Sequence, residues 1–208
     1  MMMGTIYLVC ASILWSILHS VLASHPVKVA LRRIAGEPAF DRLYRFSYNF
    51  FAVSSFYPIA MILYTFQDRS LYSIVSPWIY LTVILQAIAV IVLISTVVQI
   101  GPAEFIGWEQ LSSTATITQP ILMTDGWYAH VRHPLYVGLL VFGWLIPEMT
   151  VNRLTLLIVF TLYILIGAWF EERKLLKDFA PAYAEYKARV PMFIPKIFNR
   201  QSKIENQK

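Results

Sequence analysis

The sequence predicts an all-α integral membrane protein with about five transmembrane helices. Of its 208 residues, 58% are hydrophobic and only 14% are charged, whereas soluble proteins have roughly 25% charged residues. The apolar residues gather in long runs, several of which approach the ~20 residues that a helix needs to cross a bilayer. Basic residues are also distributed unequally between the connecting segments. The length suits a single domain.

The predicted helices correspond to five apolar runs, at residues 6–23, 46–66, 78–100, 135–146 and 154–170. We expect the first to be a retained helix and not a secretion signal, because no Lys or Arg precedes it and a basic cluster follows it. The fourth run is short, and only PEMTVN separates it from the fifth, so the two are expected to form a tight helical hairpin. Pro147 would end the fourth helix, and Thr150 or Asn152 would cap the fifth.

Positive charge sets the predicted orientation. Lys and Arg number five in residues 24–45, one in 101–134 and nine from residue 173 onward, against two in the alternate segments, Arg69 and Arg153. Because cytoplasmic loops carry the excess of basic residues, we expect the N-terminus outside and a C-terminal helix in the cytoplasm. Topology and attraction to anionic lipid account for the net charge of +5. The expected partner is therefore the lipid bilayer, and nucleic-acid binding is not needed to explain the positive charge.

The stretch DGWYAHVRHPLYVG, residues 125–138, is unusually polar for its place before an apolar run. Its Asp-Gly pair is typical of a turn, and Pro134 is typical of the first position of a helix. Arg132 and His133 then stand just before a helix N-terminus, where free N–H groups and the helix dipole attract an anion. The pattern predicts a site for a carboxylate or phosphate; contact of the same pair with lipid headgroups is the alternative.

Two carboxylates, Glu171 and Glu172, follow the fifth apolar run directly. A carboxylate near the hydrocarbon boundary is costly and usually faces a cavity or a partner. Neighbours on a helix diverge by about 100°, so we expect one to face inward and the other to pair with Lys174 or another basic group. Ordinary interfacial charge is the alternative. A cation-binding carboxylate beside an anion-binding helix start would suit a zwitterionic ligand.

The motifs GWYAHVRHPLYVG, EERKLL and YKARVPMFIP, in this order, resemble those of the isoprenylcysteine carboxyl methyltransferase and phospholipid methyltransferase superfamily. Residues 126–195 look most similar to its methanethiol S-methyltransferase branch, as do LHSVLAS and YRFSYN nearer the N-terminus. The resemblance implies an integral membrane enzyme that uses S-adenosylmethionine. It implies one methyltransferase domain over residues 1–208, with three transmembrane helices in 1–100 and a cofactor-binding catalytic part in 101–198.

The resemblance also implies roles for single residues. The cofactor carboxylate would bind at Arg132 and His133, a glutamate would accept from its ammonium or ribose hydroxyls, and tyrosine rings would face the adenine and the sulfonium. The implied cofactor-binding set is Gly126, Tyr128, Arg132, His133, Pro134, Tyr136, Glu171 and Glu172. A thiol must lose its proton to attack well, so the implied catalytic base is His130 or whichever of Glu171 and Glu172 the cofactor leaves free. The alternative is that the sulfonium alone acidifies the thiol.

Four further residues are expected to line the acceptor pocket: His19, Tyr48, Asn49 and Trp144. Ionisable residues inside a membrane are functional candidates by default, which singles out His19. A hydrogen bond between helices is the alternative for His19, and interfacial anchoring is the alternative for the aromatic residues. No metal site is expected, because His130 and His133 have no further ligands at suitable spacing.

The preferred function is methyl transfer from S-adenosylmethionine to a small or lipophilic thiol such as methanethiol. Two alternatives change the acceptor to an isoprenylcysteine carboxylate or a phospholipid amine. An NADPH-dependent membrane reductase is a third, but residues 101–131 contain no Lys or Arg to bind a 2′-phosphate. A non-catalytic membrane protein is the fourth. The sequence leaves open the acceptor, the oligomeric state and which glutamate faces the pocket.

Overall fold

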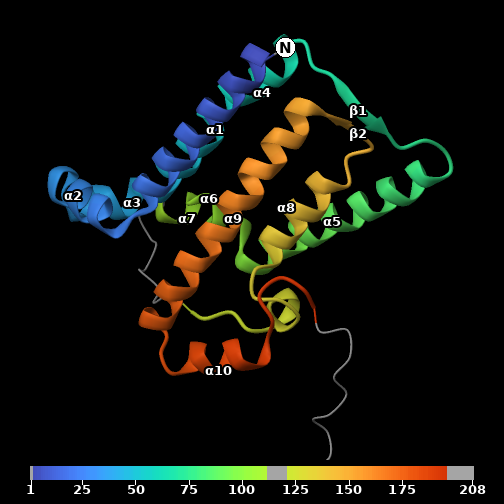
Figure 1. Ribbon diagram of the computed structural model, residues 1–208. Helices are drawn as coiled ribbons and strands as arrows, with labels where there is room; N and C mark the ends of the chain where they lie inside the picture. Colours follow the sequence, from blue (N-terminus) through green and yellow to red (C-terminus); the bar gives the residue numbers. More distant parts are fainter. Residues whose placement is uncertain (1, 112–120, 196–208) are drawn as a thin grey trace, which may run out of the picture.

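The computed structural model describes residues 2–111 and 121–195 (Figure 1). Its helices are α1 (Met2–Ala23), α2 (His25–Ala35), α3 (Glu37–Ser54), α4 (Tyr57–Thr65), α5 (Trp78–Ile100), α6 (Pro102–Ile106), α7 (Trp108–Leu111), the 3-10 helix η1 (Gly126–Ala129), α8 (Pro134–Trp144), α9 (Val151–Asp178) and α10 (Ala182–Arg189). Its strands are β1 (Ser70–Ser73) and β2 (Glu148–Thr150). Helix α1 lies beside α9, and α8 lies beside α5, with α10 beyond the end of α9. The fold is thus mostly helical, as predicted.

In the described part of the chain, four helical segments are long and apolar enough to cross a membrane: Met2–Ala23, Glu37–Thr65, Trp78–Ile100 and Val151–Asp178. Little of each is buried within the protein, so their apolar side chains form large exposed surfaces of the kind that contact lipid. The chain is therefore a multi-pass membrane protein. Helix α8, with 11 residues, is about 16 Å long, roughly half of the ~30 Å hydrocarbon core.

The second segment differs from its predicted boundaries. It was expected at residues 46–66, but the helix begins at Glu37 and is broken between α3 and α4. Residues 37–45 are too polar to lie in the hydrocarbon core. They are nevertheless helical, so α3 extends beyond the core. The break precedes Pro58, which lies in the first turn of α4, where a missing N–H group costs no helical hydrogen bond.

A two-stranded sheet corrects the all-helical expectation. Strand β1 pairs antiparallel with β2, with Ser70 opposite Thr150 and Ser73 opposite Glu148. The strands belong to the connections α4–α5 and α8–α9, so they join two loops at one end of the protein and satisfy their backbone polar groups. Strands of four and three residues are too short for an alternation to be recognised in the sequence.

The beginning of α9 is capped as predicted. The Thr150 hydroxyl accepts a hydrogen bond from the Arg153 N–H at 3.3 Å. The Asp68 carboxylate accepts one from the Asn152 N–H at 3.1 Å, and the Asn152 side chain accepts one from the Thr5 hydroxyl at 2.7 Å. These contacts satisfy first-turn donors and attach α1 to α9.

Small residues allow α5 and α8 to approach closely, as is usual for helices in membranes. Gly138 is buried in α8. A Cβ atom at this position would lie 2.7 Å from Cγ of Leu93 and 3.4 Å from the carbonyl oxygen of Ala89, both on α5. The packing of the two helices therefore depends on the absence of a side chain here.

We expect Gly138→Ala to destabilise the protein by about 1–3 kcal/mol, the usual cost of overpacking. Gly167→Ala is the matched control, since nothing lies within 4 Å of a Cβ there and alanine favours a helix over glycine. Thermal unfolding of the detergent-solubilised proteins, followed by size-exclusion chromatography, measures both. Equal melting temperatures for the two variants would contradict the close packing of α5 on α8.

Candidate functional site

The stretch that precedes α8 folds into a glycine turn, one turn of 3-10 helix and the first turn of α8. Gly126 has φ of +53°, in the left-handed region that favours glycine. A Cβ atom there would lie 2.5 Å from Oε1 of Gln99, which also accepts the Trp127 N–H at 3.3 Å. Pro134 is the first residue of α8, as predicted. Arg132 and His133 consequently lie directly before the N-terminus of α8.

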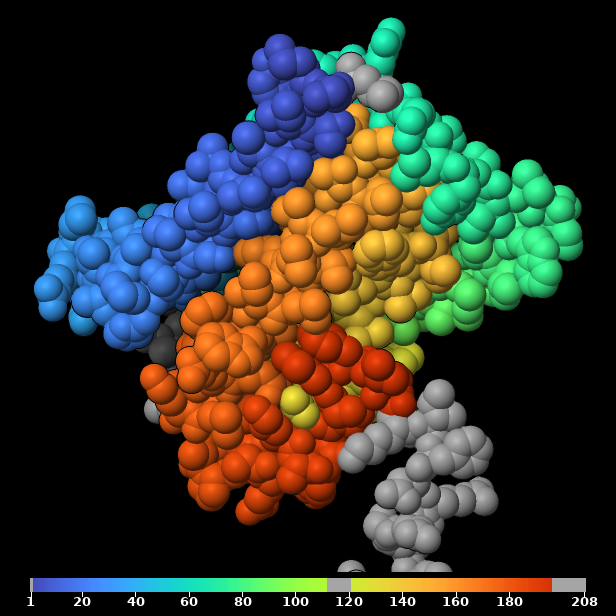
Figure 2. All heavy atoms as spheres, in the orientation of Figure 1, coloured from blue at the N-terminus to red at the C-terminus, as the bar shows by residue number. Residues whose placement is uncertain are grey.

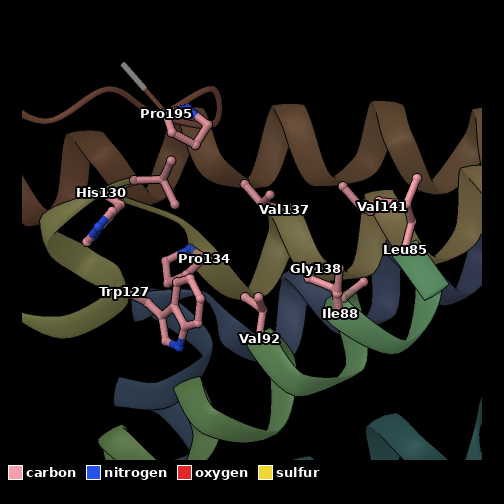
Figure 3. Close-up of a pocket in the computed structure, with 12 residues that line it drawn as sticks. Leu85, Ile88, Val92, Trp127, His130, Pro134, Val137, Gly138, Val141 and Pro195 are labelled. Atoms are coloured by element: carbon pink, nitrogen blue, oxygen red, sulfur yellow. The ribbon is translucent and has the colours of Figure 1, made fainter. Parts of the chain in front are cut away.

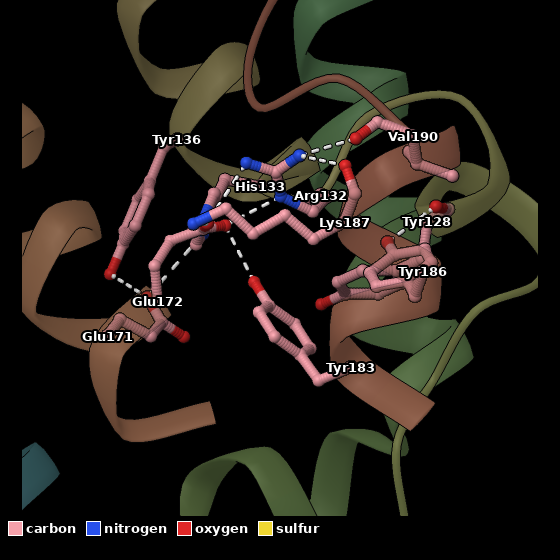
Figure 4. Close-up of polar contacts among 10 residues, drawn as sticks. All are labelled: Tyr128, Arg132, His133, Tyr136, Glu171, Glu172, Tyr183, Tyr186, Lys187 and Val190. Atoms are coloured by element: carbon pink, nitrogen blue, oxygen red, sulfur yellow. Dashed lines mark hydrogen bonds and ion pairs between the residues drawn. The ribbon is translucent and has the colours of Figure 1, made fainter. Parts of the chain in front are cut away.

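Arg132 forms a buried ion pair with Glu172 of α9 (Figure 4). Its Nε donates to Oε1 of Glu172 at 2.6 Å, and its Nη2 donates to Oε2 at 3.0 Å. The two side chains are only 8% and 5% exposed. The third guanidinium nitrogen, Nη1, donates to the carbonyls of Lys187, at 3.3 Å, and Val190. Such a bidentate pair fixes both position and orientation, so it connects the start of α8 to the C-terminal part of α9.

The acceptor positions of the Glu172 carboxylate are all occupied by groups of the protein itself. Its Oε1 also accepts the Tyr183 hydroxyl at 2.6 Å and lies 3.2 Å from Nε2 of His133. Its Oε2 lies 2.9 Å from Nζ of Lys187. With the two bonds from Arg132, these contacts occupy the roughly four lone-pair positions of a carboxylate. Glu172 therefore organises the site and has no capacity left for a ligand.

Glu171 is the open carboxylate of the site, in the sense that its side chain is accessible to solvent. Its side chain is 43% exposed and accepts the Tyr136 hydroxyl at 3.0 Å. Nδ1 of His133 lies 3.5 Å away, and the His133 ring stacks on Tyr136 at 5.3 Å between centroids. The two glutamates diverge as the helical geometry predicts, but Glu172 pairs with Arg132 and Lys187, not with Lys174.

The C-terminal segment closes one side of this cluster. The backbone N–H groups of Arg132 and His133 donate to the carbonyls of Pro191 at 2.9 Å and Met192 at 3.3 Å. In Figure 2 this segment (red) lies against the end of α9 (orange), with a few yellow atoms, from the part of the chain that precedes α8, visible between them. The backbone N–H groups of Arg132 and His133 are therefore not free to bind a ligand.

Three residues of α10 that the sequence reasoning missed complete the site: Tyr183, Tyr186 and Lys187. Their spacing places them on one helix face. This spacing, visible in YAEYK, could have revealed them. The Tyr186 hydroxyl donates to the Tyr128 carbonyl at 2.6 Å, so α10 is attached to η1 as well as to α9.

His130 lies apart from the glutamates. It is exposed, its Nδ1 lies 3.2 Å from the Gly126 carbonyl, and it borders an apolar cavity of about 260 Å³ between α5 and α8 (Figure 3). The cavity is lined by Leu85, Ile88, Ala89, Val92, Trp127, His130, Val131, Pro134, Val137, Gly138, Val141 and Pro195. Pro134, Val137 and Gly138 face α5, whereas Tyr136 reaches α9. His130 is thus on the other side of α8 from Glu171.

Of the four predicted pocket residues, the structure brings only two together. His19 Nε2 lies 2.6 Å from the Tyr48 hydroxyl. Asn49 donates to the carbonyls of Phe105 at 2.9 Å and Ile106 at 3.0 Å, which attaches α3 to the end of α6. Trp144, at the far end of α8, donates to the Thr161 hydroxyl at 3.0 Å. Within residues 2–111 and 121–195, no group of three or more His, Cys, Asp or Glu side chains could hold a metal ion.

Comparison with known proteins identifies the family. Residues 7–197 match the family described as NnrU protein. The chain belongs to the NnrU protein family. No solved structure matches it.

The curated relatives of this NnrU family member are named as methyltransferases. It is 31% identical over 191 residues to methanethiol S-methyltransferase 1 of Bradyrhizobium diazoefficiens, covering 88% of this chain and 64% of the relative. It is 43% identical over 74 residues to methanethiol S-methyltransferase 2 of the same organism, covering 36% and 29%. It is 35% identical over 83 residues to the protein-S-isoprenylcysteine O-methyltransferase of Schizosaccharomyces pombe, covering 37% and 34%. These relatives confirm the superfamily resemblance, and the matches span less than two thirds of their lengths.

The site of this NnrU family member offers charge of both signs at its surface. Glu171 and Lys187 are each about two-fifths exposed, at 43% and 42%, while the ion pair beneath them is buried. Burial, with a smaller effect of the Glu171 carboxylate, raises the pKa of Tyr128 to about 12. Tyr128 therefore keeps its proton at neutral pH. The arrangement can bind a zwitterion.

Proposed function

We propose that this chain is a membrane methyltransferase that uses S-adenosylmethionine and methylates a small or lipophilic thiol. One observation carries the proposal. Glu171, a half-exposed carboxylate, directly precedes Glu172 in α9, and the buried Glu172 carboxylate pairs with both Arg132 and the half-exposed Lys187. The relatives named as methanethiol S-methyltransferases support the reaction and the thiol acceptor.

The exposed groups fit the cofactor. S-adenosylmethionine carries an ammonium and ribose hydroxyls, which Glu171 would accept, and a carboxylate, which Lys187 would bind. Tyr128 and Tyr136 would present aromatic faces to the adenine and the cation. When bound, the cofactor supplies an electrophilic methyl group. Arg132 and His133 would position other parts of the site and would not contact the cofactor directly, since their polar groups already bond to Glu172 and to the backbone of residues 191–192.

The protein's own contribution would be alignment. Methyl transfer needs the acceptor in line with the methyl group, and a fixed site that excludes water supplies most of that advantage. Three sets of contacts hold the start of α8, the end of α9 and α10 in one arrangement. They are the Arg132–Glu172 ion pair, the hydrogen bond from the Tyr183 hydroxyl to Glu172, and the backbone hydrogen bonds to residues 191–192. The bilayer, which the exposed apolar faces of the long helices would contact, is the proposed route for an apolar acceptor.

We further propose five membrane crossings, with the N-terminus outside and α10 in the cytoplasm. Basic residues concentrate in residues 24–45 and after residue 173, and this excess supports a cytoplasmic position for these segments. Helices α8 and α9 would form the tight hairpin, with β2 at its outer turn. The cofactor site at the start of α8 and the end of α9 then opens to the cytoplasm, where S-adenosylmethionine is made.

Labelled methyl transfer in membrane vesicles tests this proposal. Inverted vesicles expose the cytoplasmic face, so S-adenosylmethionine added outside is expected to give labelled volatile thioether from methanethiol or a longer thiol. Sealed right-side-out vesicles should give none, because the cofactor carries charges that cannot cross the bilayer. Inverted vesicles from cells without the protein are the control. Label found only in phospholipid, or only as the ester of a prenylcysteine, would refute the thiol acceptor. Methyl transfer by right-side-out vesicles alone would show that the orientation is the reverse of the one proposed.

A further inference from the structure

One polar group inside a transmembrane helix has no role in the cofactor site. His19 lies in α1, and its Nε2 is 2.6 Å from the Tyr48 hydroxyl of α3. Its other ring nitrogen, Nδ1, is buried and has no hydrogen-bond partner in residues 2–111 and 121–195. A buried unpaired polar group costs about 1–3 kcal/mol, and no water is available in a bilayer to satisfy it. A bound ligand with a proton to donate would remove this cost.

The contacts of Tyr48 are compatible with a His19 tautomer that carries its proton on Nε2. The proton of the Tyr48 hydroxyl has two acceptors within reach, Nε2 of His19 at 2.6 Å and the His19 carbonyl at 3.4 Å. When the carbonyl takes it, the phenolic oxygen accepts from Nε2–H of His19, since a hydroxyl both donates and accepts. In this tautomer Nδ1 carries a lone pair and is a proton acceptor.

Aromatic rings pack around His19. Trp15 stacks on the His19 ring with centroids 4.7 Å apart, and its Nε1 is fixed by a bond of 3.2 Å to the Ala52 carbonyl. Phe56 and Phe160 pack against Trp15 at 5.7 and 5.5 Å. Aromatic surroundings of this kind suit a small apolar molecule more than a charged one.

This group of side chains is connected to the proposed cofactor site. The His19 ring faces the Tyr163 ring of α9 with centroids 6.1 Å apart. Tyr163 precedes Glu171 in the same helix by eight residues, about 12 Å along the helix axis. His19 and the open carboxylate thus share α9. An acceptor that reaches His19 from the bilayer would lie on the same side of α8 as Glu171, whereas His130 borders the cavity on the opposite side.

We propose that His19 is the base that takes the proton of the acceptor thiol, and that Tyr48 is the positioning residue that fixes its tautomer. This inference rests on the proposed function. As the sulfur–carbon bond forms, the S–H proton moves to Nδ1 of His19. The bond between the methyl group and the sulfonium breaks, and its electron pair returns to the cofactor sulfur. The products are a thioether, S-adenosylhomocysteine and a His19 imidazolium, which releases its proton to water after the thioether leaves.

Two thiols of similar size and different acidity test this role. Thiophenol is a much stronger acid than cyclohexanethiol, because its ring delocalises the thiolate charge, so it needs less help from a base. His19→Gln is expected to lower kcat for cyclohexanethiol by about 10²–10⁴-fold, the usual contribution of a general base. Its kcat for thiophenol should stay within about tenfold of wild type. His25→Gln, the same change at an exposed position of α2, is the matched control and should leave both rates unchanged.

Tyr48→Phe provides a second variant that keeps the imidazole. It should show the same selective loss with cyclohexanethiol, smaller than that of His19→Gln, because only the tautomer is disturbed. Equal losses with both thiols, or no loss with either, would show that His19 only packs α1 against α3 and would overturn the inference while leaving the proposed function intact. A wild-type protein that methylates neither thiol would overturn the proposed function, and this inference with it.

Discussion

Replacing Glu172 with glutamine is expected to cost about 3–5 kcal/mol of stability, the usual penalty for removing one partner of a buried ion pair. The change keeps the shape of the side chain but leaves the guanidinium of Arg132, 8% exposed, without its counter-ion. Lys187 and Tyr183 lose their charged acceptor at the same time. Thermal unfolding of the purified protein in detergent measures the effect.

Glu171→Gln is the matched control for this prediction, because it makes the same chemical change at the next residue of α9. Glu171 is half-exposed and accepts one described hydrogen bond, from Tyr136, so its stability should change by less than about 1 kcal/mol. A Glu172→Gln protein as stable as Glu171→Gln would show that the Arg132–Glu172 pair does not hold α8 and α9 together.

The second large effect is expected on cofactor binding. Glu171→Gln should weaken the affinity for S-adenosylmethionine by about 10–100-fold, because a hydrogen bond to a charged group contributes roughly 1.5–3 kcal/mol and each 1.4 kcal/mol is tenfold. Equilibrium dialysis with labelled cofactor measures the affinity. Glu185→Gln, on the exposed face of α10, is the control and should bind like wild type. Unchanged binding by Glu171→Gln would remove Glu171 from the cofactor site.

Features with local signals were predictable from the sequence. The long apolar runs correspond to α1, α5 and α9, since hydropathy is a strong signal for segments that cross a bilayer. Helix α9 continues to Asp178, eight residues beyond the predicted end at residue 170. Pro134 begins α8 and Thr150 caps α9, because both residue types favour helix starts for reasons that need no tertiary contact.

Features that depend on long-range contacts were not predictable. Arg132 and Glu172 are 40 positions apart, and only the packing of α8 on α9 decides that they pair with each other and not with a ligand. The same packing determines that Glu171 is the open carboxylate. Asn49 and Trp144 were expected in the acceptor pocket by residue type alone, but each instead bonds a neighbouring helix. Their roles in a pocket stay predictions.

The central claim is that the cluster at the start of α8 and the end of α9 binds S-adenosylmethionine through Glu171. Equilibrium dialysis of the purified wild-type protein with labelled cofactor tests it most directly. The expected result is saturable binding of one cofactor per chain, competed by S-adenosylhomocysteine and strongly weakened in Glu171→Gln. Binding that does not saturate, or that saturates equally in wild type and Glu171→Gln, would contradict the claim.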